Sequence, residues 1–431
     1  MAIRAELLGK RFSLVFWVLM ALLLLGLPLA FAWRAAPGNE KVVKPVTARI
    51  PIASWKSVDV LVNEQKFEAA AAQAEKILAG AKARGDEPEW TKALVRVTQL
   101  RMGLHGYETA VKRLKEELGP KSPLQHATLD LFYAQSIVGY CQSYSWEIGH
   151  RERVESNAGV DLNAWTRDQL YAEAQRAYLE VWGQRLALGG EPVSTLKEYI
   201  HPNDYPAGVR DTLRNAVSYL YAALLADSRF WTPEQSNDLF RLDRAQLLAD
   251  GPRSAEADAV LADAKAHPLQ KLVAVLGDLE AWHAAHRQKE AELEARLERL
   301  RKLHDALSED PDRALVLKDL DSRLDRFRGV PWWSMGKAQQ VEYTREEDRP
   351  DALIRARAMA LDGQKAYPES VGGQRCNHIV QSIQAPDFRL SGMALDGPDR
   401  RSLEVDHRNI RALFFRAYPV DLLERIHTSK D

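Results

Sequence analysis

Cysteine is scarce in this sequence. Cys141 and Cys376 are the only two cysteines among 431 residues, which is too few for a disulfide framework or a cysteine-rich metal site. In an oxidising compartment the two could form one disulfide, but the sequence alone does not bring them within bonding range. Two separate buried thiols are the alternative, and both interpretations stay open at this point.

A surplus of charge of either sign is also missing. The 59 Lys and Arg residues are matched by 60 Asp and Glu residues, which leaves a net charge of −1. Proteins that bind nucleic acid neutralise phosphates with an excess of basic side chains. The composition therefore predicts that nucleic acid is not a partner.

Catalytic signatures are missing as well. The sequence contains no Walker A loop, no Gly-x-Gly-x-x-Gly after a predicted strand and no Gly-x-Ser-x-Gly elbow. Each cysteine has a histidine near it in the sequence that could act as its base, His150 for Cys141 and His378 for Cys376. A nucleophilic cysteine also needs an oriented third group, and neither neighbourhood carries a family signature for one. We therefore predict a protein that is not an enzyme and that holds no cofactor.

Side chains that could bind a metal recur at one place. His283, His286 and Glu290 stand at i, i+3 and i+7, which on one continuous helix gives one face with a geometry compatible with zinc. The metalloprotease pattern His-Glu-x-x-His is absent, and helical histidine pairs without it are more often structural or solvated. We therefore predict no metal site. His283, His286 and Glu290 are the candidate ligands for the less favoured alternative.

An uncharged run stands near the N-terminus. Residues 12–33 carry no charged side chain, whereas Arg4, Lys10 and Arg11 precede them. A helix needs about 20 apolar residues to span a bilayer, and flanking basic residues mark its cytoplasmic side. The run predicts a single-pass inner-membrane anchor, with residues 12–33 in the membrane and the body of the chain in the periplasm.

The same run also fits a signal peptide. Pro28 interrupts the helix near its end, and Ala30, Phe31 and Ala32 form an A-x-A cleavage pattern. Cleavage after Ala32 would give a secreted or periplasmic protein. Both alternatives export the rest of the chain, so the sequence predicts export without deciding between an anchor and a cleaved peptide.

Helical periodicity dominates the body of the chain. Apolar residues recur at three- and four-residue steps, and stretches near 66–78, 90–100 and 107–118 alternate with glycine-containing turns, a rhythm similar to tetratricopeptide (TPR) hairpins. The predicted fold is therefore mainly α. The predicted parts are a signal anchor or signal peptide (1–34), a linker (35–54), a TPR-like α-helical region (55–264), a long helical arm (265–328), a C-terminal helical pair (329–385) and an incomplete β domain (386–431).

The predicted arm carries two rows of leucines at heptad spacing. Glu292 with Arg296, and Glu298 with Lys302, form i,i+4 pairs beside these rows. The pattern predicts a long helical hairpin that packs along one stripe and has water-exposed flanks. The leucines are Leu269, Leu272, Leu276, Leu279, Leu293, Leu297, Leu300 and Leu307.

The period changes to two beyond Pro386. Residues 402–406 alternate between polar and apolar, and the stretch 412–418 has its apolar side chains on one side. Pro419 limits the second stretch to an edge strand or a bulge. The pattern predicts strands, but too few to close a sandwich.

Several short sequence segments resemble segments of a known protein family. His-Pro-Asn-Asp-Tyr-Pro occupies 201–206, Arg-Asp-Thr-Leu-Arg occupies 210–214 and Trp-Thr-Pro-Glu-Gln-Ser-Asn occupies 231–237. These phrases resemble the helical N-terminal region of large bacterial alpha-2-macroglobulin-like proteins. The phrases at 367–376 and 407–418 look like the junction into that family's first macroglobulin β domain, so the resemblance implies that residues 386–431 are macroglobulin-like.

The resemblance implies a role in an exported protease-trap family. Its members are commonly cleaved in a bait region, and many then capture the protease through a Cys-x-Glu-Gln thioester. Here Gln, Ser and Tyr follow Cys141, and Asn, His and Ile follow Cys376, so neither matches. The implied protein is a non-catalytic envelope protein without bait region or thioester that acts by protein–protein contacts. Its expected partner is the remaining macroglobulin domains or another envelope protein.

A second hypothesis follows from the helical rhythm alone. A free-standing periplasmic TPR-like scaffold could dock an envelope enzyme or transporter. The two hypotheses differ at the C-terminus, where an orphaned β fragment favours the first.

Overall fold

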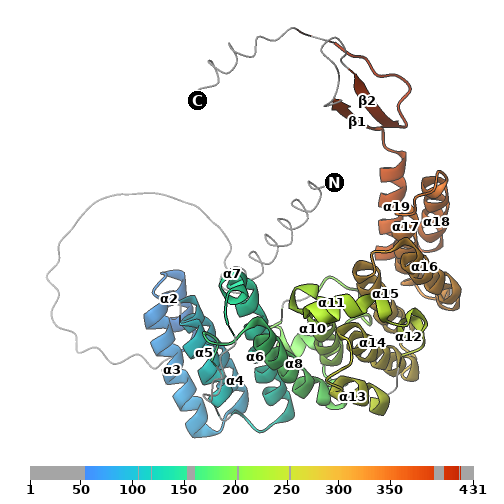
Figure 1. Cartoon of the computed structure of the whole chain (residues 1–431). Helices are drawn as coiled ribbons and strands as arrows, with labels where there is room; N and C mark the ends of the chain where they lie inside the picture. The colour runs from blue at the N-terminus through green and yellow to red at the C-terminus, as the bar shows by residue number, and fades with distance from the viewer. Residues whose placement is uncertain are drawn as a thin grey trace. The chain divides into compact units, whose positions relative to one another are not determined.

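The structure, a computed structural model, describes residues 54–418 except 105, 118, 153–160, 201–202, 252–253, 393–401 and 417. Within these residues the chain is mainly α-helical with one two-stranded antiparallel sheet, which confirms the predicted helical class (Figure 1). The predicted anchor or signal peptide lies outside the described residues. None of the described helices is long and apolar enough to cross a bilayer.

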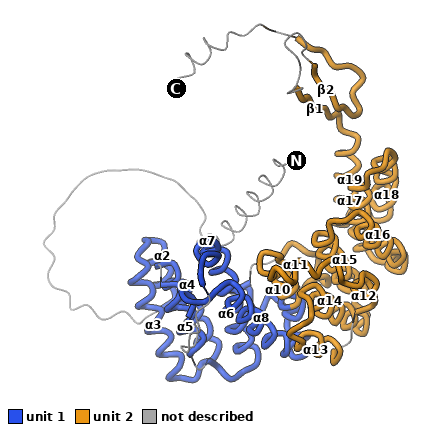
Figure 2. The backbone as a smooth tube through the Cα atoms, viewed as in Figure 1, with its two compact units in different colours: residues 1–201, 212–217 blue, residues 202–211, 218–431 orange. Residues whose placement is uncertain are grey.

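The chain divides into two compact units (Figure 2). Unit 1 comprises Met1–His201 and Thr212–Val217, and unit 2 comprises Pro202–Asp211 and Ser218–Asp431. The division falls inside helix α10 (Leu213–Ala226).

Successive helices pair in unit 1. Helix α3 packs against α2 and α4, and α6 packs against α8. Gly85 ends α3 with a φ of 66°, a left-handed conformation that glycine adopts at little cost, and Asp86 caps α4. The predicted helical hairpins are thus present. The elements are α2 (Trp55–Asn63), α3 (Phe67–Arg84), α4 (Glu87–Gly103), α5 (Tyr107–Glu116), α6 (Pro123–Ser143), α7 (Ser145–Gly149), α8 (Arg167–Gly183), α9 (Arg185–Leu188) and η1 (Val193–Leu196).

Small side chains bring α3 and α4 together. Ala70, Ala74 and Ala81 on α3 and Ala93 on α4 are completely buried, and Leu94 fills the space beside them. Short side chains allow close backbone approach, and burial of this stripe stabilises helices that would be marginal in isolation.

Unit 2 continues with helices and ends in a hairpin. Its elements after α10 are η2 (Ser228–Phe230), α11 (Pro233–Asp238), η3 (Leu239–Arg241), α12 (Arg244–Leu248), α13 (Ser254–Ala262), α14 (Pro268–Ala285), α15 (Lys289–Ala306), α16 (Asp310–Leu324), η4 (Asp325–Phe327), α17 (Trp333–Arg345), α18 (Ala352–Ala366), α19 (Val371–Gln384), β1 (Asp387–Gly392) and β2 (Leu403–Arg408).

The predicted arm is part of the core of unit 2. Helices α14 and α15 form a hairpin and pack along each other, and Arg287 makes the turn between them with a φ of 59°. Their leucine rows are buried, as the heptad spacing predicts. The prediction of water-exposed flanks is wrong, because α12, α16 and α17 cover them.

Of the two i,i+4 ion pairs predicted for the arm, the structure contains one. Lys302 lies 3.6 Å from Glu298, as predicted. Glu292 instead lies 3.3 Å from Arg326, because Arg296 turns into the protein interior.

The last three helices form a small bundle. The stretch 329–385, predicted as a helical pair, holds three helices: α18 and α19 pack on each other, and α17, which the prediction missed, packs against both. The core between them holds Ala338, Val341, Ala356, Ala360, Cys376, Ile379, Val380 and Ile383.

The terminal strands differ from the prediction. β2 extends the predicted strand at 402–406, but its partner is β1, which the prediction missed. In the described part of 412–418 the chain is not in a strand, so that prediction is wrong. The alternation Asp-Phe-Arg-Leu-Ser in 387–391 has the period of two that predicts a strand.

Gly372 sets the distance between α17 and α19. A Cβ atom there would lie 2.2 Å from the backbone nitrogen of Met335. We expect Gly372→Ala to push the helices apart and to destabilise unit 2 by about 1–3 kcal/mol or more, as overpacking does. A lower apparent Tm, measured by circular dichroism, checks this.

The matched control is Gly329→Ala, in the same unit. A Cβ at Gly329 would meet no atom within 4 Å, so its Tm should stay near that of the wild type. Equal losses in the two variants would contradict the argument from close packing.

Candidate functional site

His283, His286 and Glu290 do not share one helical face. His283 lies on α14, His286 is the residue that follows its end, and Glu290 lies on α15 after the turn. Nδ1 of His283 lies 2.8 Å from Oε1 of Gln288, and a carboxylate oxygen of Glu290 accepts a hydrogen bond from the backbone of Trp332 at 3.2 Å. The predicted common face is wrong because the helix stops between the residues. Among the described residues no group of three His, Cys, Asp or Glu side chains could hold a metal ion.

Cys141 and Cys376 are separate, buried thiols and form no disulfide. Burial raises the pKa of each thiol to about 12. Because the thiolate is the nucleophile, neither side chain is activated for chemistry at neutral pH. Cys376 instead donates a weak hydrogen bond to the carbonyl of Ser334 at 3.4 Å.

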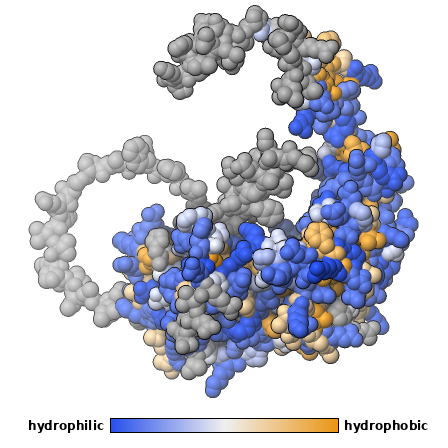
Figure 3. All heavy atoms as spheres, in the orientation of Figure 1, coloured by the Kyte–Doolittle hydropathy of each residue, from blue (hydrophilic) through white to orange (hydrophobic). Residues whose placement is uncertain are grey.

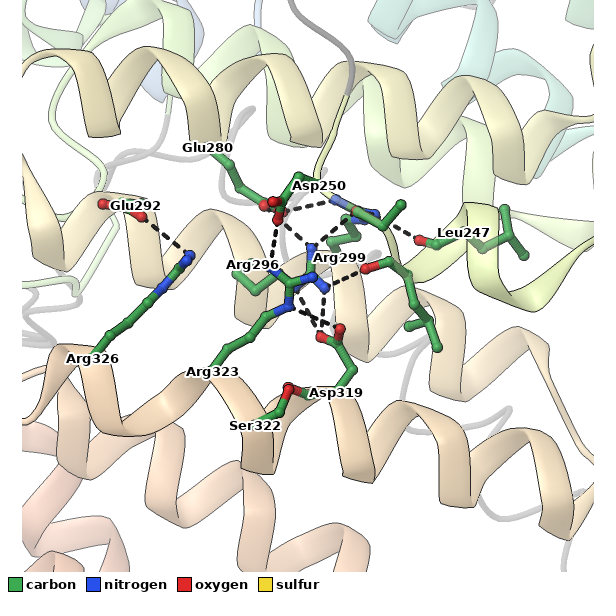
Figure 4. Close-up of polar contacts among 12 residues, drawn as sticks. Leu247, Asp250, Glu280, Glu292, Arg296, Arg299, Asp319, Ser322, Arg323 and Arg326 are labelled. Atoms are coloured by element: carbon green, nitrogen blue, oxygen red, sulfur yellow. Dashed lines mark hydrogen bonds and ion pairs between the residues drawn. The ribbon is translucent and has the colours of Figure 1, made fainter.

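Two buried guanidinium groups complete the end of α12 (Figure 4). Arg299 donates to the carbonyl oxygens of Leu247 and Ala249 at 2.7 and 2.5 Å, and Arg296 donates to that of Leu248 at 2.6 Å. The last carbonyls of a helix have no partner within it. The two arginines of α15 satisfy these groups and place positive charge at the negative end of the helix dipole.

Carboxylates from two further helices balance these cations. Asp319 on α16 lies 2.5 Å from Arg296 and 3.0 Å from Arg323, and Glu280 on α14 lies 3.4 Å from both Arg296 and Arg299. Burial lowers the pKa of Arg299 to about 10, against the opposing effect of Glu280, so the group remains charged at neutral pH. We call these five side chains the α15 charge cluster.

A second group of charges ties the segment before α10 to α15. Arg210 lies 2.5 Å from Glu294 and 2.9 Å from Glu298, and Arg301 lies 2.6 and 2.7 Å from the same two carboxylates. The Arg210 guanidinium also lies 3.7 Å from the ring centroid of Tyr219. Arg210 belongs to one of the phrases behind the family resemblance, and its role here is structural.

The β1–β2 hairpin has one apolar and one polar face. In the register Leu390 pairs with Val405 and Gly392 with Leu403, and Phe388 lies on the same side. We call Phe388, Leu390, Leu403 and Val405 the hairpin apolar face. On the other side Asp387 lies 3.6 Å from Arg408, and Ser391 donates to Glu404 at 3.2 Å.

The apolar face is open to solvent among the described residues. Phe388, Leu390 and Leu403 are 54%, 43% and 61% exposed, and Figure 3 shows hydrophobic atoms at the surface over the hairpin. Alternation of apolar and charged residues is typical of a sheet that buries one face. The hairpin therefore has the sequence of a covered sheet and the exposure of an uncovered one.

The base of the hairpin is fixed to the helical bundle. Asn409, with a φ of 57°, donates to the carbonyl oxygens of Ile383 and Ala385 at 2.8 and 3.2 Å. Arg408 donates to that of Ser382 at 3.3 Å. The end of α19 is thus capped by the chain that leaves β2, which holds the hairpin on the bundle.

No family model matches this chain, and no curated protein or solved structure matches it either. The function is therefore argued from the geometry of the described residues. Buried, mutually neutralised charges leave the α15 charge cluster no open group for a substrate. The hairpin apolar face is the candidate functional site, and what it can do is bind another apolar surface.

Breaking the α15 charge cluster is expected to loosen unit 2. Arg299→Ala would leave Glu280 and the carbonyls of Leu247 and Ala249 without this partner, and removing one member of a buried ion pair costs about 3–5 kcal/mol. Hydrogen exchange followed by mass spectrometry should show faster exchange in peptides from α12 and α15. Arg326→Ala, which removes the exposed pair with Glu292, should change stability by less than about 1 kcal/mol. Similar exchange in both variants would refute this role of the α15 charge cluster.

Acid should weaken unit 2 through Glu298. Burial alone would raise its pKa, but the charges of Arg301 and Arg210 outweigh burial and lower the pKa to about 2. A lowered pKa adds stability that is fully present above the ordinary value near 4.3 and is lost as pH falls towards 2, by about 1.4 kcal/mol per unit.

The measurement is urea unfolding of the wild type and Glu298→Gln at several pH values. The stability difference between them should be largest at pH 6 and should shrink between pH 4.5 and 2. Glu369→Gln, which alters an exposed carboxylate, should give no such trend. A difference that does not depend on pH would show that Glu298 acts by packing alone.

Proposed function

We propose that this chain is a non-catalytic envelope protein that acts through protein–protein contacts, with the hairpin apolar face as its docking surface. The observation that carries the proposal is the open apolar side of β1 and β2. An isolated two-stranded hairpin is marginal in water, and it gains stability when a further apolar surface covers it.

The partner that fits this surface is an apolar sheet face of another protein. Each strand of the hairpin has a neighbour on one side only among the described residues. Both edges can therefore accept a further strand, and the apolar face can pack against a second sheet about 10 Å away. The opposite face carries charged and polar side chains, among them the pair of Asp387 and Arg408, which leaves the apolar face as the side that docks.

Export of the chain is the second part of the proposal. Its support is the uncharged run 12–33 with basic residues on its N-terminal side. The resemblance to bacterial alpha-2-macroglobulin-like proteins is consistent with both parts, since it implies that the strands are the start of a β domain and that the partner is the rest of such a protein.

The alternative is a free-standing periplasmic scaffold that docks an envelope enzyme or transporter through its TPR-like helices. The observation that favours it is a small pocket between α2 and α4. In that case the hairpin would be accessory, and contacts would come from unit 1.

Photo-crosslinking from the hairpin distinguishes the two. With benzoylphenylalanine at Leu390 or Leu403 in the full chain, expressed in its native cells, we expect a crosslink to an exported protein, at a residue within a β-sheet. The apolar side chains face the partner in the proposed contact, so these positions are within reach of it.

Arg389 is the matched control, because it neighbours Leu390 and lies on the opposite face. It should give little or no product, and Leu390→Glu should weaken binding of the identified partner about tenfold or more, whereas Arg389→Glu should not. Equal crosslinking from both faces, crosslinks only to lipid or to this chain itself, or no crosslink at all would refute the proposal.

A further inference from the structure

Unit 1 contains a pocket that the proposed hairpin contact does not use. Helix α2 contributes Trp55 and Asp59, helix α4 contributes Lys92 and Arg96, and the segment after η1 contributes Glu198 and Tyr199. Its volume is about 160 Å³. Pockets for drug-sized molecules and cofactors enclose about 300–1,000 Å³, so this one suits a smaller group, such as one or two residues of a peptide.

The two cations of the pocket differ in what they contact. Lys92 lies 3.0 Å from Glu198, and its ammonium is 4.9 Å from the ring centroid of Trp55. Arg96, one helical turn further along α4, is half-buried and makes no hydrogen bond or ion pair with the residues that the structure describes. A guanidinium with no carboxylate of its own is a preorganised fork for a carboxylate from outside.

Aromatic groups form the apolar part of the pocket and are held in place. The indole nitrogen of Trp55 donates to Glu89 at 2.8 Å, which fixes the plane of the ring. Burial, together with the charges of Glu198 and Glu89, raises the pKa of Tyr199, so its hydroxyl stays protonated and can donate a hydrogen bond. An apolar side chain next to the bound carboxylate would lie against these rings.

The charges around Arg96 favour a carboxylate over a phosphate. Asp59 and Glu198 line the same pocket, and Lys92 is already neutralised by Glu198. The pocket thus holds two cations and two carboxylates, and among them Arg96 is the cation that can turn to a ligand with a single negative charge. A phosphate group, with a charge of about −1.5 to −2, would meet more repulsion from the two carboxylates.

We propose that this pocket binds the carboxylate of an extended peptide, with Arg96 as its main contact and Trp55 and Tyr199 against the neighbouring side chain. The carboxylate comes either from the C-terminus of the peptide or from an Asp or Glu side chain. This site is in unit 1 and does not depend on the hairpin, so each proposal can fail without the other.

The test uses synthetic heptapeptide pools and the full chain immobilised on a surface. The first pool has a free C-terminal carboxylate and no Asp or Glu. The second has an amidated C-terminus and one Asp or Glu, and the third is amidated and has no acidic residue. We expect the wild type to enrich peptides from the first or second pool, which identifies the source of the carboxylate, and not from the third.

Arg96→Gln should weaken binding of the enriched peptides about tenfold or more, because a charge-assisted hydrogen bond is lost. Arg96→Lys keeps the positive charge without the forked guanidinium, so its affinity for the peptides should lie between those of the wild type and Arg96→Gln. The matched control, Arg167→Gln, removes an exposed arginine at the start of α8 and makes the same change in net charge. It should bind like the wild type, and all variants should keep the wild-type circular dichroism spectrum.

Four outcomes would overturn the proposal. Three of them concern peptide binding. They are enrichment from the third pool as strong as from the others, equal binding by Arg96→Gln and the wild type, and no enrichment from any pool. Competition by inorganic phosphate at lower concentration than by acetate would also overturn it, since it would show a phosphate site.

Discussion

The burial of Arg296 and Arg299 is the interaction on which unit 2 depends. Two charged groups are removed from water, which is costly unless their donors are satisfied by good partners. Here the partners are the carbonyls at the end of α12 and carboxylates from α14 and α16. Because these partners come from three helices, the arginines fix the positions of all three around α15.

Helix α15 shows how a charged helix can lie inside a protein. Its arginines contact α12, α14 and α16, and Glu294 and Glu298 contact Arg210 in the segment before α10 and Arg301 within the helix. Each cation is close to a carboxylate, so the helix is nearly neutral where it is buried. Leucines fill the space between these contacts. Packing and charge pairing together determine this core.

The hairpin is the opposite case. Its charged side chains lie on one face, and its apolar side chains on the other face remain open. Burial of apolar surface is the main driving force for folding and for association, so this surface is where unit 2 can gain most from a contact. Asn409 and Arg408 hold the hairpin on the bundle, which presents the surface without a long flexible link.

Some features were determined by the sequence alone. Apolar spacing predicted the helical class, the hairpins of unit 1 and the α18–α19 pair, and alternation predicted the strand at 402–406. These signals are local, since they arise from neighbours along one element. The sequence also has too few cysteines for a disulfide framework, and its balance of 59 basic and 60 acidic residues predicts that nucleic acid is not a partner.

Only the tertiary structure decided the rest. It separated His283 from Glu290 by a turn, buried Arg296 and Arg299 on a flank predicted to be exposed to water, and paired β2 with β1, a strand that the prediction missed. It also brought Arg96 and Tyr199 into one pocket. Each of these outcomes depends on residues far apart in the chain, because whether a charge is exposed, paired or buried is set by the neighbours that folding supplies.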